Sequence, residues 1–377
     1  MRNREFDKHE DRVKRIKMLL SLLLVTFLAT GFCACSVLDV MEIKSDDNTV
    51  SGTIELSNRI NEEAKSGVDE VILYIENATE DEIKNITGNM GMFWGTPTEY
   101  TILDSDSGDG TLKIKFFIEK SNNYYVVNKY LNGRDIPEKH TEAEAILKKV
   151  QIILKKIIKK DMTDYEKELA IHDWLVKKIQ YDDSIDASST ENGSYGAMVE
   201  KKTMCRGYAE SMKLLAECCG LKTQVIVGTA IDPDGHKIGH AWNLVKLEDQ
   251  WYHLDVTYDD PVGDNGKDIH YYYFNLNDSD INKDHYWEKE YFPACNNDSY
   301  MYYKENGLYY TDHDAFQSSL KKMIENDRPS FTEVLLDEKK ITESQLQFIF
   351  NTGSVKSLSW STHSSDPVIL TIIPNYY

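Results

Sequence analysis

The sequence predicts an α+β protein with a larger central region between two smaller α+β regions. Three observations support this fold class. A helix-spaced apolar stripe follows Cys205 directly, formed by Tyr208, Met212, Leu215, Ala216 and Cys219. Strand-like segments rich in β-branched and aromatic residues then follow at 224–228, 240–247 and 251–258. Helix and strand patterns also alternate on both sides of this region, which favours separate α+β units.

Length, composition and charge limit the classes of protein. The 377 residues leave room for two or three domains. A hydrophobic content of 41% with 23 tyrosines is typical of chains that form real cores. The formal net charge of −20 disfavours nucleic acid as a partner.

Residues 1–34 are predicted to be a lipoprotein signal peptide. Seven Lys/Arg and four Asp/Glu residues precede an apolar stretch from Met18 to Ala34, and Cys35 follows in a lipoprotein-like box. Cys35 is the expected lipidation site, Cys33 is a weaker candidate, and an uncleaved signal anchor is the alternative. Residues 35–50 are then a polar tether. This places the protein at the cell membrane, lipid-anchored on the extracytoplasmic face.

Residues 51–135 are predicted to form an N-terminal α+β domain without a chemical motif. The pattern indicates two helices, at 54–64 and 79–86, and three strand segments, at 70–76, 112–118 and 124–127. The acidic turn at 104–110 could suggest calcium, but it lacks the ligand spacing and terminal Glu of an EF-hand loop. A solvated turn is the simpler interpretation.

Residues 136–295 are predicted to form the central domain. Thr141 and Thr163 each begin a capping-box pattern with a Glu three residues later, so both should start helices. His172 lies on the second helix and is expected to be a packed or hydrogen-bonded histidine. Cys205 lies at the start of the next helix, where unpaired backbone N–H groups and the helix dipole favour a thiolate.

The segment after this helix contains a predicted hairpin. If Glu248 and Asp249 form its turn, His240 and Asp255 are diagonal neighbours on one face of the two strands; a three-residue turn would shift this register. In the favourable register, Asp255 can orient the imidazole of His240. His240 can then accept the Cys205 proton, which is the nucleophile–base–orienter arrangement of a catalytic triad. Each of these residues alone would more often be structural.

The central region contains the motifs Cys205-Arg-Gly-Tyr-Ala-Glu, His240-Ala-Trp-Asn and Trp251-Tyr-His-Leu-Asp255-Val-Thr-Tyr-Asp-Asp-Pro261, with Tyr165 to Val176 upstream and Tyr273 to Asn277 and Asp284-His-Tyr-Trp downstream. Together these motifs resemble the transglutaminase-like superfamily of cysteine acyl-transfer enzymes, in a bacterial lipoprotein branch. The resemblance implies a papain-like fold, in which a cysteine-bearing helix packs on an antiparallel sheet. It also implies that Cys205 is the nucleophile, His240 the general base and acid, and Asp255 the orienting carboxylate.

The resemblance implies acyl transfer at a peptide, protein or cell-wall peptide amide through a Cys thioester, with no cofactor. Peptidase, deamidase and transamidase outcomes all remain open, because water or an amine can resolve the thioester. The alternative is a non-catalytic cell-envelope scaffold lipoprotein that uses a transglutaminase-like domain. Tyr181, Tyr195 and Trp242 are candidate cleft or oxyanion residues.

No metal is expected. His236 and His240 are four residues apart, but they lie between a turn and a strand and lack the Glu of a zinc motif. Cys218, Cys219 and Cys295 are interpreted as packing residues, because their spacing gives neither a metal pattern nor a regular disulfide framework.

Residues 296–377 are predicted to form a C-terminal α+β domain. The pattern indicates a hairpin at 302–310 around Asn306-Gly307, helices at 314–326 and 341–350, and strands at 331–336 and 367–373. Because the order of helices and strands resembles that of residues 54–118, the two flanking regions could be copies of one unit. Different strand orders in the two regions would refute this hypothesis.

Overall fold

The computed structural model describes residues 48–76, 93–104, 111–186, 189, 191–260, 269–337, 341–363 and 367–377. The predicted signal peptide with Cys33 and Cys35, most of the tether, the helix expected at 79–86 and most of the acidic turn lie outside these residues. Among the described residues, no helix combines the length and apolar character needed to cross a membrane.

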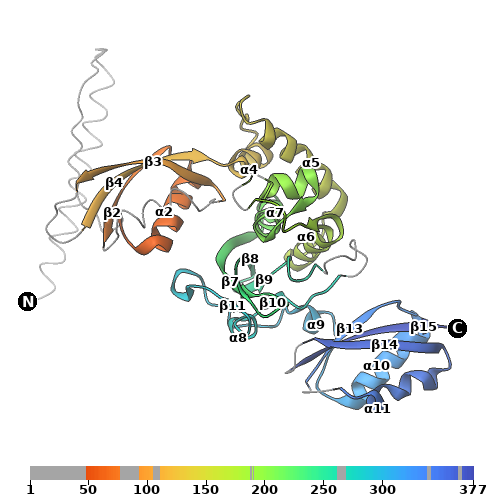
Figure 1. The fold of residues 1–377 in the computed structure, drawn as a ribbon. Coiled ribbons are helices and arrows are strands. Elements are labelled where there is room, and N and C mark those ends of the chain that lie inside the picture. Colours follow the sequence, from red (N-terminus) through yellow and green to blue (C-terminus); the bar gives the residue numbers. More distant parts are fainter. Residues whose placement is uncertain are drawn as a thin grey trace, which may run out of the picture. The chain divides into compact units, whose positions relative to one another are not determined.

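The N-terminal region contains a four-stranded sheet with the strand order β1-β2-β4-β3 (Figure 1). Its elements are β1 (Thr49–Ser51), α2 (Gly52–Ser66), β2 (Glu70–Glu76), β3 (Gly95–Asp104), β4 (Thr111–Lys120) and α4 (Asn122–Asn132). The strand predicted at 124–127 is wrong, because these residues lie inside α4. The Ser121 side chain accepts a hydrogen bond from the backbone N–H of Tyr124 and so caps this helix.

The central region packs helices against an antiparallel five-stranded sheet of order β10-β9-β8-β7-β11. Its helices are α5 (Thr141–Ile157), α6 (Asp164–Lys178), η3 (Gly196–Glu200), α7 (Cys205–Cys218), α8 (Asp278–Ile281) and η4 (Lys289–Tyr291). Its strands are β5 (Gln180–Tyr181), β6 (Lys202–Thr203), β7 (Lys222–Ile231), β8 (Lys237–Leu247), β9 (Gln250–Leu254), β10 (Phe274–Leu276) and β11 (His285–Tyr286). The predicted α+β class and papain-like core are confirmed.

The two predicted capping boxes have different outcomes. At α6 the Thr163 side chain accepts from the Glu166 backbone, and the Glu166 side chain accepts from the Thr163 backbone, as predicted. At α5 the cap residue is His140, and Thr141 is already the first helical residue. The helix therefore starts one residue earlier than the Thr-x-x-Glu pattern predicts.

The C-terminal region contains a second four-stranded sheet, of order β12-β13-β15-β14. Its elements are α9 (Tyr302–Glu305), β12 (Tyr309–Tyr310), α10 (His313–Asn326), β13 (Thr332–Leu336), α11 (Glu343–Leu346), η5 (Gln347–Thr352), β14 (Val355–His363) and β15 (Val368–Tyr376). The hairpin predicted around Asn306-Gly307 is wrong. Gly307, at φ +66°, follows the helical turn α9, and Tyr309 then pairs in parallel with Leu335 of β13.

The two flanking sheets have the same topology. In each, the first two strands of the sheet in chain order are parallel and are joined through a helix, α2 or α10. The second and fourth strands are antiparallel, and so are the third and fourth. The strand orders therefore agree with the hypothesis of two similar units.

One buried cluster includes residues from both the N-terminal and the central region, from Val50 to Phe274. The predicted apolar stripe of α7 contributes to it, with Tyr208, Met212, Leu215 and Ala216 fully buried. Burial of this stripe fixes α7, and hence Cys205, on the central sheet.

Candidate active site

Cys205 is the first residue of α7 and is half-buried. The first turn of the helix lies unusually close to β6: a Cβ atom on Gly207 would come within 1.9 Å of the Thr203 Oγ1. Only glycine allows this approach. The Thr203 hydroxyl donates in turn to the Glu191 carbonyl, which ties the helix start to the preceding loop.

Arg206 and Glu210 connect the start of α7 to its surroundings. The Arg206 Nε donates to the Glu210 Oε1 at 2.7 Å. The Glu210 Oε2 accepts from the Ser194 backbone N–H at 3.2 Å and from the Asn123 Nδ2 at 3.3 Å. The Glu of the Cys205-Arg-Gly-Tyr-Ala-Glu motif therefore holds the loop before the cysteine and helix α4 against α7.

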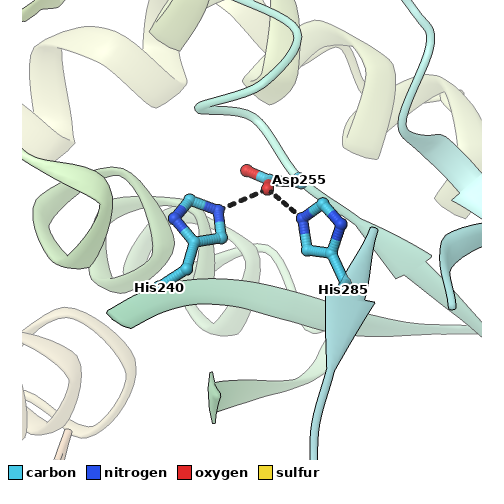
Figure 2. A group of neighbouring side chains, drawn as sticks. All are labelled: His240, Asp255 and His285. Carbon is cyan, nitrogen blue, oxygen red and sulfur yellow. Dashed lines mark hydrogen bonds and ion pairs between the residues drawn. The ribbon is translucent and has the colours of Figure 1, made fainter. Parts of the chain in front are cut away.

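His240 and Asp255 meet as the sequence predicts. Leu247 pairs with Gln250, so Glu248 and Asp249 form the two-residue turn that the favourable register requires. The His240 Nε2 lies 2.6 Å from the Asp255 Oδ2, and both side chains are buried (Figure 2). Burial alone would lower the pKa of His240, but the charge and hydrogen bond of Asp255, and then those of Cys205, raise it to about 10.

Cys205 lies close enough to His240 to contribute to its raised pKa. Because Asp255 engages Nε2, Nδ1 is the imidazole nitrogen that remains for the thiol. The structure thus brings Cys205, His240 and Asp255 close together. This geometry allows proton transfer from the thiol to an imidazole whose orientation is fixed by a carboxylate.

Asp255 is fully buried and accepts four hydrogen bonds. Its Oδ1 accepts from the backbone N–H groups of Thr257 at 2.9 Å and Tyr258 at 3.2 Å. Its Oδ2 accepts from His240 and, at 2.9 Å, from the His285 Nε2 on the other side (Figure 2). Burial would raise the pKa of Asp255, but the charges and hydrogen bonds of the two histidines hold it well below its usual range.

His285 is a direct neighbour of Asp255 that the sequence analysis misses. It lies within one of the family-like motifs, but spacing gives it no role, because its contact with Asp255 depends on β11 returning to pair with β7. The sequence does contain one usable signal, the aspartate directly before His285. The adjacent Asp284 accepts from the His285 Nδ1 at 2.6 Å, and a carboxylate partner of this kind often marks a histidine with a fixed orientation.

The three candidate cleft residues lie in different environments. Tyr181 is half-buried on β5, opposite Thr203 of β6, and it interacts electrostatically with Cys205 and Asp255. Burial, and then these charges, raise the pKa of Tyr181, so its hydroxyl keeps its proton. Tyr195 packs against the main core cluster at the start of η3.

Trp242 is fully buried and packs near the rings of His240 and His285. Its ring lies 6.0 Å from the His240 ring and 5.0 Å from the His285 ring. Its indole N–H donates to the His253 Nδ1 at 3.0 Å, so this donor is not available to an oxyanion. Trp242 therefore supports the two histidines by packing.

His172 belongs to a separate buried network, as expected for a packed histidine. Its Nε2 lies 3.2 Å from Asp259 and its Nδ1 lies 3.3 Å from Asp173. Burial would lower the pKa of His172, but these two carboxylates raise it to about 9.

Three groups in the described part of the chain have donor atoms close enough to be considered as metal ligands: His240, Asp255 and His285; His253, Asp278 and Cys295; and Asp232, Asp234 and His236. In the second group the His253 Nδ1 accepts a hydrogen bond from the Trp242 indole N–H, so Nε2 carries the imidazole proton and donates to Asp278. A metal at this Nε2 would require an imidazolate. His236 and His240 fall in different groups, and each has its own aspartate partner, Asp232 or Asp255.

Comparisons with known proteins give one family match and several similar solved structures. Residues 152–256 match the model of the transglutaminase-like superfamily. No curated protein matches the chain. Similar solved structures include a TGase (15% identity, 49% of this chain, 50% of that chain, TM-score 0.27). They also include a candidate cysteine protease from Cytophaga hutchinsonii (14% identity, 50% of this chain, 65% of that chain, TM-score 0.25).

A third solved structure is the periplasmic domain of TgpA from Pseudomonas aeruginosa, with 14% identity over 43% of this chain and 63% of that chain, at a TM-score of 0.24. The aligned region thus spans half of the TGase chain and less than two thirds of the TgpA domain. The family match contains Cys205 and His240 and ends one residue after Asp255. Residues 152–256 of this protein are therefore a transglutaminase-like domain.

Proposed function

We propose that this protein is an extracytoplasmic cysteine enzyme that transfers the acyl group of a peptide or protein amide through a thioester on Cys205. One observation carries the proposal: the Nε2 of His240 is held 2.6 Å from the buried Asp255 carboxylate, and Cys205 is near enough to this imidazole to help raise its pKa. A purely structural domain has no need for a thiol, an imidazole and a carboxylate in contact.

The first half-reaction forms the thioester. The Cys205 thiol gives its proton to the His240 Nδ1, and the thiolate attacks the amide carbon. A C–S bond forms as the carbonyl electron pair moves to oxygen. The C–N bond then breaks, and the leaving nitrogen takes the proton from His240 and departs as ammonia or an amine.

The second half-reaction releases the acyl group. Water or an amine attacks the thioester carbon and transfers a proton to His240, and the C–S bond breaks to restore the thiolate. Water gives a carboxylic acid, so the net result is peptide hydrolysis or deamidation. An amine gives a new amide, so the net result is transamidation.

Two donors are proposed to stabilise the oxyanion of both tetrahedral intermediates. The backbone N–H of Cys205 is in the first turn of α7 and has no intrahelical acceptor. The Tyr181 hydroxyl is the proposed second donor, because Tyr181 interacts electrostatically with Cys205 and keeps its proton.

The proposed location and lipid anchor rest on the sequence of residues 1–35 alone. Cells fed an alkyne-tagged fatty acid should incorporate it into this protein. Cys35→Ala should abolish incorporation and Cys33→Ala should not; incorporation into Cys35→Ala would contradict the assignment.

The reaction is tested with glutamine-containing peptides, incubated with and without methylamine and followed by mass spectrometry. Cleavage, deamidation and methylamine incorporation give different product masses. We expect the wild-type protein to form at least one of these products and Cys205→Ala to form none. Cys219→Ala is the matched control, because Cys219 lies at the other end of α7 and should be dispensable. Equal product formation by Cys205→Ala would refute the proposal.

A further inference from the structure

We propose that His285 is a positioning residue of this site: as an imidazolium it holds Asp255 from the side opposite His240, and so sets the pH range over which Cys205 and His240 form an ion pair. This inference rests on the proposed function above. His285 lies on β11, outside the segment that matches the family model, so that match does not assign it a role.

The contacts of His285 require both of its nitrogens to carry protons. Its Nε2 lies 2.9 Å from the Asp255 Oδ2, and its Nδ1 lies 2.6 Å from the Asp284 Oδ1. Ionised carboxylates only accept hydrogen bonds, so a neutral imidazole could satisfy just one of them. The other oxygen of Asp284 already accepts from the Tyr273 hydroxyl at 2.6 Å. The geometry therefore favours the imidazolium form.

The surroundings of His285 make its charge effective. The side chain is fully buried, and its ring lies 5.0 Å from Trp242, 4.9 Å from Tyr258 and 5.3 Å from Tyr273. Water is excluded from these contacts, so charges interact more strongly than at the surface. Burial would lower the pKa of His285, but its hydrogen bonds to Asp255 and Asp284 raise it.

The charged and titratable groups around His285 come from several elements. They are Asp255 after β9, Asp284 before β11, His240 on β8, His253 on β9, and the phenols of Tyr258 and Tyr273. The two phenols have pKa values raised by burial and stay neutral. Asp255 thus lies between two imidazoles, and the rings of His240 and His285 are 5.4 Å apart.

This arrangement predicts the sign of the effect. A positive charge at His285 opposes protonation of His240 and shares the negative charge of Asp255. Without that charge, Asp255 interacts with His240 alone, so the His240 imidazolium loses its proton at a higher pH. The Cys205 thiol also loses its proton at a higher pH, because a positive charge that favours the thiolate is gone. The lower and upper limits of the pH range in which the ion pair exists should therefore both rise.

The test measures alkylation of Cys205 by iodoacetamide in the full chain from pH 4 to 10, for the wild type, His285→Gln and His285→Leu. Glutamine keeps a donor for Asp255 but removes the charge. We expect its half-maximal pH to rise by about one unit, so that alkylation below the midpoint is about tenfold slower, with the plateau rate retained. Leucine removes the donor as well, so the plateau rate should also fall.

His172→Gln is the matched control, because it removes an equally buried histidine from a different network. It should leave the half-maximal pH unchanged. A midpoint for His285→Gln that equals that of the wild type would overturn the proposal.

A measurement on the wild type does not depend on whether the variants fold. Side-chain ¹⁵N NMR at pH 7 should show both nitrogens of His285 protonated, and a single protonated nitrogen would overturn the proposal. Failure of the proposed function would look different: Cys205 of the wild type would then show no preferential alkylation at any pH.

Discussion

Asp255→Asn is expected to slow acyl transfer by about ten-thousandfold, the scale seen when a triad carboxylate becomes an amide. The reason is specific to this site, because all four contacts of Asp255 come from donors: two imidazole N–H groups and the backbone N–H groups of Thr257 and Tyr258. An amide offers one acceptor oxygen and one NH₂ group. In either orientation, the introduced NH₂ group would face donors and disrupt the site.

The rate is measured with the best peptide substrate found for the wild-type protein. Asp259→Asn is the control, since Asp259 is equally buried but accepts from His172 and the Tyr273 backbone. This control should lower stability while changing the rate less than about tenfold, because Asp259 does not contact Cys205 or His240. Similar rates for Asp255→Asn and the wild type would show that Asp255 does not orient His240.

Trp242→Ala is expected to lower the free energy of unfolding by about 3–5 kcal/mol, as for other large buried side chains. The side chain is fully buried, and its ring packs against those of His253, His285 and Trp287. Trp242→Phe keeps most of the packing but leaves the His253 Nδ1 without its donor. The free energy of unfolding of that variant should therefore fall by about 1–3 kcal/mol.

Urea unfolding followed by circular dichroism measures these changes. Trp360→Ala is the control, because Trp360 on β14 is 36% exposed and should cost less than about 1 kcal/mol. An equal decrease in the free energy of unfolding for Trp242→Ala and Trp360→Ala would contradict the view that packing of Trp242 supports the two histidines.

The candidate triad could be predicted from the sequence because local signals specify it. The apolar stripe of α7 places Cys205 at a helix start, and the two-residue turn at Glu248-Asp249 determines the register of His240 and Asp255. Both signals act over short stretches of chain, where side-chain spacing determines which face a residue lies on.

His285 could not be predicted in the same way. It lies thirty residues after Asp255 and reaches it only because β11 pairs with the far edge of β7. Gly228 contributes to this approach, since a Cβ atom there would come within 2.4 Å of the Tyr286 carbonyl. Such a contact depends on tertiary pairing, which residue spacing does not encode.

The errors in secondary structure also have physical causes. Tyr124 to Val127 have the composition of a strand, but the Ser121 cap and the burial of Val126 and Val127 on one side place them in α4. Asn306-Gly307 is a common hairpin turn, yet here Gly307 follows the helical turn α9. In both cases, the composition of a short segment does not decide between helix, strand and turn.

The central claim is that Cys205 and His240 form a reactive pair, and limited alkylation of the wild-type protein tests it most directly. The protein is treated with substoichiometric iodoacetamide across pH 5 to 9, and the labelled cysteine is identified by mass spectrometry, with His240→Ala alongside. We predict that Cys205 is labelled far faster than Cys218, Cys219 and Cys295, because burial raises the pKa of those three thiols. The reactivity of Cys205 at low pH should be lost in His240→Ala. Slow, equal labelling of Cys205, Cys218, Cys219 and Cys295 would contradict the account and favour a scaffold role for the domain.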